Sequence, residues 1–162
     1  MTGLRETIAT TKREVERTRD DLLTTFSFVP DDKLEWSPGG AARSALWLVG
    51  HCGATNHAFA ALLRGERPDL PSDPALLLAA IRAGGQETRT REEAIRGVRE
   101  GTDEILAALG TVTEERLAGM SDTPFGPMPF TIWIDAARTH MGGHARQLDY
   151  LQTIWGDVED HR

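Results

Sequence analysis

Apolar residues recur every three or four positions along most of this chain, and no stretch alternates as a half-buried strand does. The apolar stripes are separated by segments rich in glycine, proline and aspartate, which favour turns. This pattern predicts four long helices and one short helix, over residues 2–28, 42–64, 74–83, 91–109 and 130–155. The sequence therefore indicates an all-α fold class.

Four long amphipathic helices bury their stripes most simply against one another, as a four-helix bundle. The sequence shows no internal repeat, and we expect one domain spanning residues 1–162. The connections over residues 65–90 and 110–129 leave room for crossovers, so consecutive helices need not be antiparallel. The predicted short helix lies inside the first of these connections.

The charge balance argues against a nucleic-acid partner. Acidic residues outnumber basic ones by 25 to 18, giving a net charge of -7, whereas nucleic-acid binding depends on basic side chains. No apolar run approaches the roughly 18 to 20 residues that a membrane-spanning helix needs, and the polar start of the chain does not resemble a secretory signal. Cys52 is the only cysteine, so no internal disulfide can form. We expect a cytoplasmic protein that binds neither nucleic acid nor membrane.

Three histidines fall on the apolar stripes of two predicted helices. His140 and His144 are four residues apart on the last helix, so both imidazoles can reach one point. His51 occupies a similar position on the second helix. Each histidine could instead be a core residue bonded to a nearby acceptor, but no carboxylate shares their stripes. We therefore predict one divalent metal ion held by all three, with a coordination position left open.

Glycines flank these histidines. Gly50 and Gly53 lie beside His51, and Gly142 and Gly143 separate the two histidines of the last helix. Each glycine inside a helix costs about 1 kcal/mol relative to alanine. The four glycines predict space cleared for close helix approach or for a ligand, although simple tolerance in a chain with 16 glycines is the alternative.

More specific interpretations of these residues fail. The HxxxH spacing of the last helix is that of zincin proteases, but Met141 stands where their general-base glutamate belongs. A di-iron site needs a glutamate three residues before each histidine, where this chain has Ala137 and Met141. His57 lies about 120° around the helix from the first histidine of the set, on another face, and has a weaker claim as a ligand. Cys52 is expected to be a small buried side chain.

Three segments together resemble the DinB superfamily of bacterial four-helix bundles. They are LEWSP at residues 34–38, RSALWLVGH at residues 43–51 and HMGGHARQL at residues 140–148. In the family, the first histidine of a metal-binding triad ends the second of these segments, and the other two histidines form the HxxxH of the third. One departure is Ala145-Arg146, where the family usually has Arg-Gly before the glutamine.

The resemblance covers nearly the whole chain and carries further implications. It implies an up-up-down-down order of helices, a homodimer, and metal binding by His51, His140 and His144. We expect zinc or nickel as the ion, although sites of three imidazoles accept several first-row metals. Some members of the family are transferases or isomerases that use low-molecular-weight thiols such as mycothiol or bacillithiol. A small-molecule substrate is therefore expected.

Three functions remain open from the sequence. The leading one is a metal-dependent thiol S-transferase or isomerase acting on small electrophiles. The second is a metal-dependent hydrolase, in which a bound water is the nucleophile. The third is a non-catalytic, metal-stabilised bundle that serves as a binding or stress protein.

Several other side chains are candidates for a pocket near the metal. Trp47, Trp133 and Phe125 could line it, although aromatic residues at helical spacing are more often core. Arg43 and Arg146 could hold a carboxylate of a cofactor, although exposed arginines are common on helices.

Overall fold

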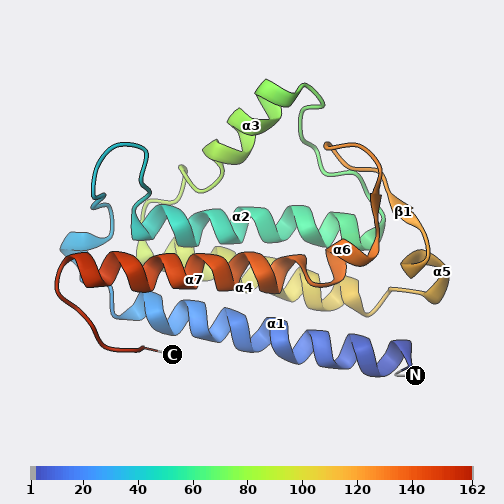
Figure 1. The fold of residues 1–162 in the computed structure, drawn as a ribbon, viewed down its shortest axis with the longest axis horizontal. Coiled ribbons are helices and arrows are strands. Elements are labelled where there is room, and N and C mark those ends of the chain that lie inside the picture. Colours follow the sequence, from blue (N-terminus) through green and yellow to red (C-terminus); the bar gives the residue numbers. More distant parts are fainter. Residues whose placement is uncertain (1–2, 162) are drawn as a thin grey trace.

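Four long helices lie side by side in the computed structural model, which describes residues 3–161 (Figure 1). They are α1 (Leu4–Ser27), α2 (Ala45–Arg64), α4 (Arg91–Leu109) and α7 (Ala136–Ile154). The short helix α3 (Pro74–Ala83) lies above α2, at the position predicted for it. The all-α bundle is thus confirmed. None of the helices in residues 3–161 is long and apolar enough to cross a membrane.

The helix directions are up-down-down-up, so the up-up-down-down order was wrong. Helices α1 and α7 are parallel, as two contacts between them show. Gly142 lies near Thr18, and further along both helices the Gln152 amide donates to the Thr25 carbonyl oxygen over 3.2 Å. Helices α2 and α4 are also parallel (Figure 1). The reason is the position of the crossover. The connection after α1 simply turns back into α2, whereas residues 65–90 must return along the length of α2 before α4 begins.

Local capping groups determine where the helices start. Helix α2 begins at Ala45 rather than at residue 42, because the Ser44 hydroxyl accepts a hydrogen bond from the Trp47 amide at 3.2 Å. Asp73 caps α3 in the same way. Thr90 and Glu93 form a reciprocal capping box at the start of α4.

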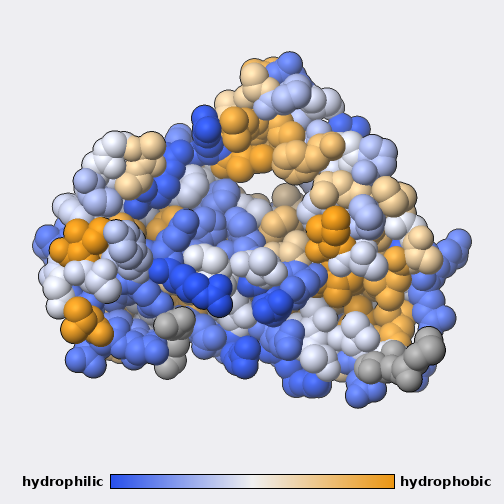
Figure 2. Space-filling model, viewed as in Figure 1, coloured by the Kyte–Doolittle hydropathy of each residue, from blue (hydrophilic) through white to orange (hydrophobic). Residues whose placement is uncertain are grey.

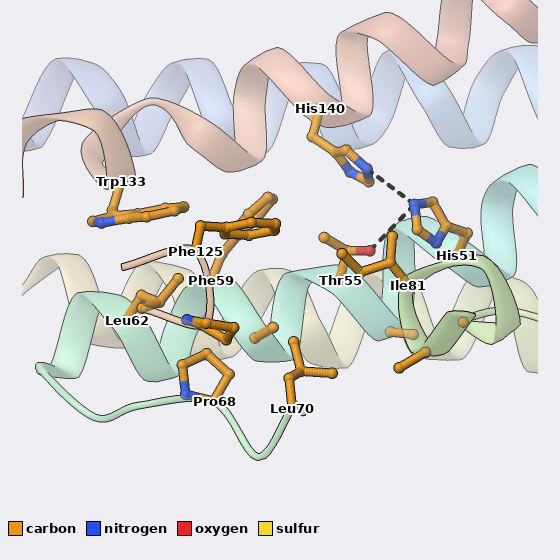
Figure 3. Close-up of a pocket in the computed structure, with 15 residues that line it drawn as sticks. His51, Thr55, Phe59, Leu62, Pro68, Leu70, Ile81, Phe125, Trp133 and His140 are labelled. Carbon is orange, nitrogen blue, oxygen red and sulfur yellow. Dashed lines mark hydrogen bonds between the residues drawn. The ribbon is translucent and has the colours of Figure 1, made fainter. Parts of the chain in front are cut away.

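The predicted helix over residues 130–155 is broken at Asp135 into α6 (Thr131–Ile134) and α7. Asp135 has φ -109° and ψ 0°, which departs from regular α-helical dihedrals, and its carboxylate accepts hydrogen bonds from Arg138 and Thr139 of the first turn of α7. The break lets α6 leave the line of α7. As a result, Trp133 lies over the pocket described below (Figure 3).

The segment predicted as a loop over residues 110–129 contains ordered elements. They are α5 (Glu114–Leu117) and an antiparallel ribbon of β1 (Met120–Ser121) and β2 (Met128–Pro129). Elements this short carry no periodic pattern that a sequence reading could detect.

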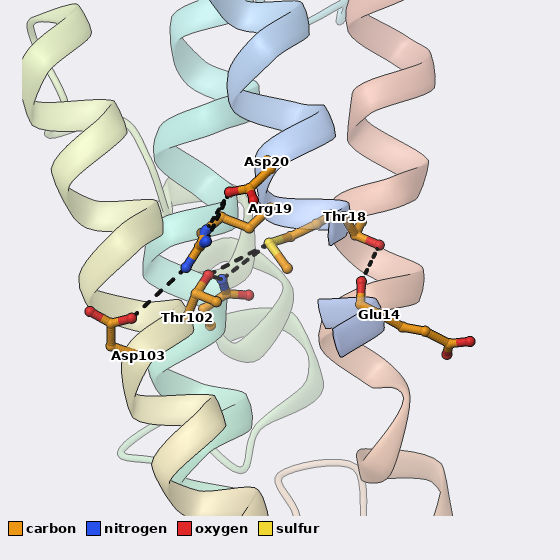
Figure 4. Close-up of polar contacts among 8 residues, drawn as sticks. Glu14, Thr18, Arg19, Asp20, Thr102 and Asp103 are labelled. Carbon is orange, nitrogen blue, oxygen red and sulfur yellow. Dashed lines mark hydrogen bonds and ion pairs between the residues drawn. The ribbon is translucent and has the colours of Figure 1, made fainter. Parts of the chain in front are cut away.

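One contiguous hydrophobic core joins the four long helices. Its largest fully buried apolar side chains include Phe26, Leu22, Leu63, Ile105, Leu109, Met141 and Leu148. A small polar group lies within it, where the Asn56 amide donates to the Thr102 hydroxyl at 3.3 Å and to the Met141 sulfur at 3.4 Å. Figure 4 shows Thr102 at this contact. Nearer the surface, Arg19 of α1 lies between Asp20 of the same helix and Asp103 of α4 (Figure 4). These hydrogen bonds offset the cost of burying the Asn56 amide nitrogen and the Thr102 hydroxyl, whereas the Asn56 side-chain oxygen is buried without a partner.

Glycines allow α2 and α4 to touch backbone to backbone. A Cβ added to Gly53 would lie 2.8 Å from the carbonyl carbon of Gly97, and one added to Gly50 would collide with Thr88. By contrast, a Cβ on Gly142 would make an ordinary contact and one on Gly143 would meet nothing within 4 Å. Close approach of α4 therefore accounts for Gly53, and close approach of the connection before α4 accounts for Gly50, whereas neither accounts for the pair in α7.

We expect opposite effects from the same substitution at two of these glycines. Gly53→Ala should lower the free energy of unfolding by about 1–3 kcal/mol, because the α2 and α4 backbones must separate. Gly143→Ala should raise it by about 1 kcal/mol, because alanine favours the helix and its methyl group is free of contacts. Urea denaturation of the chelator-treated proteins measures both. Equal changes in the two variants would contradict the close α2–α4 packing.

Candidate metal centre

Three imidazoles converge between α2 and α7. The Nε2 atom of His140 lies 3.2 Å from the Nε2 of His51 and 3.2 Å from the Nε2 of His144. Each histidine offers one nitrogen to a cluster in which these atoms all lie within 4.8 Å of one another. The structure therefore brings together the three histidines that the sequence singled out. No carboxylate or thiol of residues 3–161 joins them in this cluster.

The donor set fits a shared metal ion. Neutral imidazole nitrogens that face one another at 3.2 Å either share protons or oppose their lone pairs, and a cation between them removes that repulsion. Two nitrogens bound at 2.0–2.1 Å to one tetrahedral zinc ion lie about 3.3 Å apart. The two shortest nitrogen separations in the cluster are close to this value.

Burial keeps these imidazoles neutral. Desolvation, with the neighbouring His144, lowers the pKa of His51 to about 4. Desolvation and the other two histidines lower the pKa of His140 to about 3. Desolvation also lowers the pKa of His144, and its hydrogen bond to Gln147 partly opposes the change. Neutral imidazole is the form that binds metals, so protons do not compete for the site near neutral pH.

Gln147 orients His144. The Nδ1 atom of His144 lies 2.7 Å from the Gln147 side-chain oxygen, which can only accept, so Nδ1 carries the proton. The Nε2 atom is then left with its lone pair toward the other two histidines. A partner of this kind raises the basicity of a metal-binding imidazole and fixes its orientation. The sequence signal for Gln147 was its place three residues after His144, on the same helix face.

His51 is held on both sides. Its ring stacks on Trp47, with centroids 4.6 Å apart and planes at 11°. The Arg43 guanidinium lies over the Trp47 ring, 4.4 Å from its centroid. The Thr55 hydroxyl lies 3.5 Å from the His51 Nε2. The backbone of Gly84 lies beside the His51 Nδ1 and partly offsets the lowering of the His51 pKa. The two groups are not aligned well enough to form a hydrogen bond. The helical spacing of the sequence places Thr55 on the same stripe as His51, whereas nothing in the sequence indicates that Gly84 lies beside the site.

A cavity of about 380 Å³ opens beside the histidines. Figure 2 shows the surface hollowed between α3 and the bundle, with hydrophobic residues of α3 facing the hollow. His51, Thr55 and His140 lie at one end, and Trp133 lies at the other (Figure 3). The remaining lining residues are Ala54, Ala58, Phe59, Leu62, Pro68, Leu70, Ala80, Ile81, Gly84, Pro124 and Phe125.

Other candidates lie away from the cluster. The His57 Nδ1 lies 3.1 Å from the Glu104 carboxylate, on the α4 side of α2. Cys52 is fully buried, and desolvation raises the pKa of its thiol, so it is a core side chain as expected. Arg146 lines a separate depression between α1 and α7, whereas Arg43 lies next to the histidines through Trp47.

The lowered pKa values predict how the stability of the metal-free protein depends on pH. Between about pH 4 and the ordinary histidine value of 6.5, the unfolded chain binds more protons at these histidines than the folded chain does. The free energy of unfolding should therefore fall as the pH is lowered through this window. Thermal melts in the presence of a chelator measure this, with a His140→Ala variant as the comparison. If the variant has the same pH dependence as the parent, burial of His140 is not its source.

Comparison with known proteins agrees with this fold. The sequence profile of the DinB superfamily matches residues 14–148. The crystal structure of a DinB-like protein from Bacillus subtilis superposes on this chain with a TM-score of 0.65 and 17% sequence identity, covering 93% of this chain and 94% of that one. A search of curated proteins gave no match. Because the family profile spans most of the sequence, this chain belongs to the DinB superfamily.

Proposed function

We propose that this protein is a metal-dependent thiol S-transferase, with zinc or nickel held by His51, His140 and His144. The observation that carries the proposal is a cluster of three neutral imidazoles at the end of a mostly apolar cavity. Three protein ligands are typical of reactive metal sites, whereas structural sites are usually closed by four. A purely structural ion would need neither an open position nor a cavity beside it.

Three side chains near the cluster have a part in this proposal. When bound, the ion supplies a positive charge that favours the thiolate form of a nearby thiol at neutral pH. Gln147 keeps the His144 lone pair directed inward, and the apolar wall formed by Phe59 and Ile81 excludes water from the sulfur. The thiol proton passes to solvent, the sulfur forms a bond to an electrophilic carbon, and the leaving group departs with its electron pair.

Arg43 is positioned to hold the thiol cosubstrate. It borders a second depression, of about 270 Å³, that also contains Gln147 and Tyr150 and so lies next to His144. No carboxylate among residues 3–161 forms an ion pair with Arg43. Mycothiol and bacillithiol are both known from relatives in this family. The Arg43 guanidinium is therefore available to a carboxylate of bacillithiol, whereas mycothiol carries none.

The cavity supports transfer over hydrolysis. Water activation for ester or amide cleavage commonly uses a protein carboxylate as the general base. The cavity lining within the described chain contains no aspartate or glutamate. A thiolate that attacks directly needs no such base.

Calorimetry on the metal-loaded protein tests the proposal. We expect mycothiol or bacillithiol to bind, and Arg43→Ala to weaken the binding of bacillithiol by at least tenfold, since a charge-assisted hydrogen bond to its carboxylate contributes roughly 1.5–3 kcal/mol. Arg146→Ala is the matched control and should bind as the parent does, because Arg146 lies on the α1 side of α7. Metal-loaded protein that binds neither thiol would overturn the proposal.

A further inference from the structure

The floor of the cavity is one stripe of α2. Residues 51, 54, 55, 58, 59 and 62 all line the cavity, and they recur at the three- and four-residue spacing of a single helix face. From His51 to Leu62 the helix rises about 16 Å, at 1.5 Å per residue. The small side chains of Ala54 and Ala58 leave space above the middle of the stripe. The cavity is therefore elongated, with the histidines at one end.

The walls of the cavity are apolar along its length. Ala80 and Ile81 of α3 cover it from one side, while Leu70 and Phe125 come from the connections that follow α2 and β1. Trp133 closes the end that lies away from the histidines (Figure 3). Phe59 lies between the two ends, with its ring centroid 6.2 Å from that of Trp133 and 5.6 Å from that of His140.

The polar side-chain groups that face the cavity gather at the histidine end, since the indole nitrogen of Trp133, at the other end, points away from it (Figure 3). Of the side chains that line the cavity, those with polar groups near the histidine end are His51, Thr55 and His140, and none of the lining residues is Asp, Glu, Lys or Arg. An unpaired charge placed in such surroundings would lose its hydration without a partner, at a cost of several kcal/mol. The volume of about 380 Å³ lies near the lower end of the usual range for small-molecule sites, about 300–1,000 Å³.

We infer that the electrophile taken by this site is an uncharged, elongated, mainly apolar molecule. Its reactive carbon lies at the imidazole end and its apolar tail extends along α2 toward Leu62 and Trp133. That the bound molecule is an electrophile rests on the proposed function. That the site binds an uncharged apolar chain follows from the cavity alone. The thiol and the electrophile would then approach the histidines from different sides, because Arg43 lines another depression.

Straight-chain primary alcohols from butanol to decanol are suitable probes, titrated calorimetrically into the metal-loaded protein without any thiol. We expect affinity to rise by about fourfold per added CH₂ group until the cavity is filled, and then to level off. Octanoate, which has the same chain with a charged end, should bind at least tenfold more weakly than octanol to a chelator-treated sample. Affinity that does not change with chain length would overturn the inference.

Ala58→Phe fills the floor of the cavity and should abolish octanol binding. Ala107→Phe is the matched control, because Ala107 is exposed on α4, and it should bind octanol as the parent does. Leu70→Asp adds a charge to the wall of the cavity and should weaken octanol binding. Because Leu70 lies in a connection rather than a helix, this variant keeps the test valid if Ala58→Phe disturbs folding. Full binding by both cavity variants would overturn the inference.

These measurements separate the two proposals. Octanol binding without thiol binding would support the apolar site and remove the transferase function. Thiol binding with no binding of any alcohol would support the function and overturn the apolar electrophile.

Discussion

The parallel packing of α2 against α4 shapes the rest of this molecule. Gly53 and Gly97 bring the two backbones into contact, and both helices run in the same direction. A chain that leaves one end of α2 must therefore return along its whole length before α4 can start. That return carries α3 over the exposed stripe of α2 and forms the roof of the cavity beside His51. One packing constraint thus determines both the crossover and the pocket.

The histidine cluster is costly without a ligand. Three imidazoles give up most of their contact with water, and His140 and His51 each keep a buried Nδ1 without a hydrogen-bond partner. The core contains hydrophobic side chains of similar volume at neighbouring positions, such as Leu48 and Leu148, so nothing in the packing demands histidine here. A divalent ion would recover that cost, and binding it would stabilise the folded state by mass action.

The sequence predicted the long helices and the clustered histidines because both depend on periodicity, which is local information. His140 and His144 share a face whatever the rest of the fold does. Helix order could not be predicted in this way, since it depends on which end of the bundle each connection crosses. The break at Asp135 was also missed, because it depends on hydrogen bonds to the turn that follows. The cavity combines segments distant in sequence, so its lining was only partly anticipated, through Trp133 and Phe125.

Metal content is the most direct test of the central claim, that these three histidines hold one ion. Protein purified without a metal-affinity tag can be analysed by plasma mass spectrometry beside two histidine variants. The account predicts about one divalent ion per chain in the parent and in His57→Ala, and loss of that ion in His140→Ala. His57 pairs with Glu104 away from the cluster, so it controls for histidine removal as such. Equal metal in all three proteins, or none in the parent after reconstitution, would contradict the account.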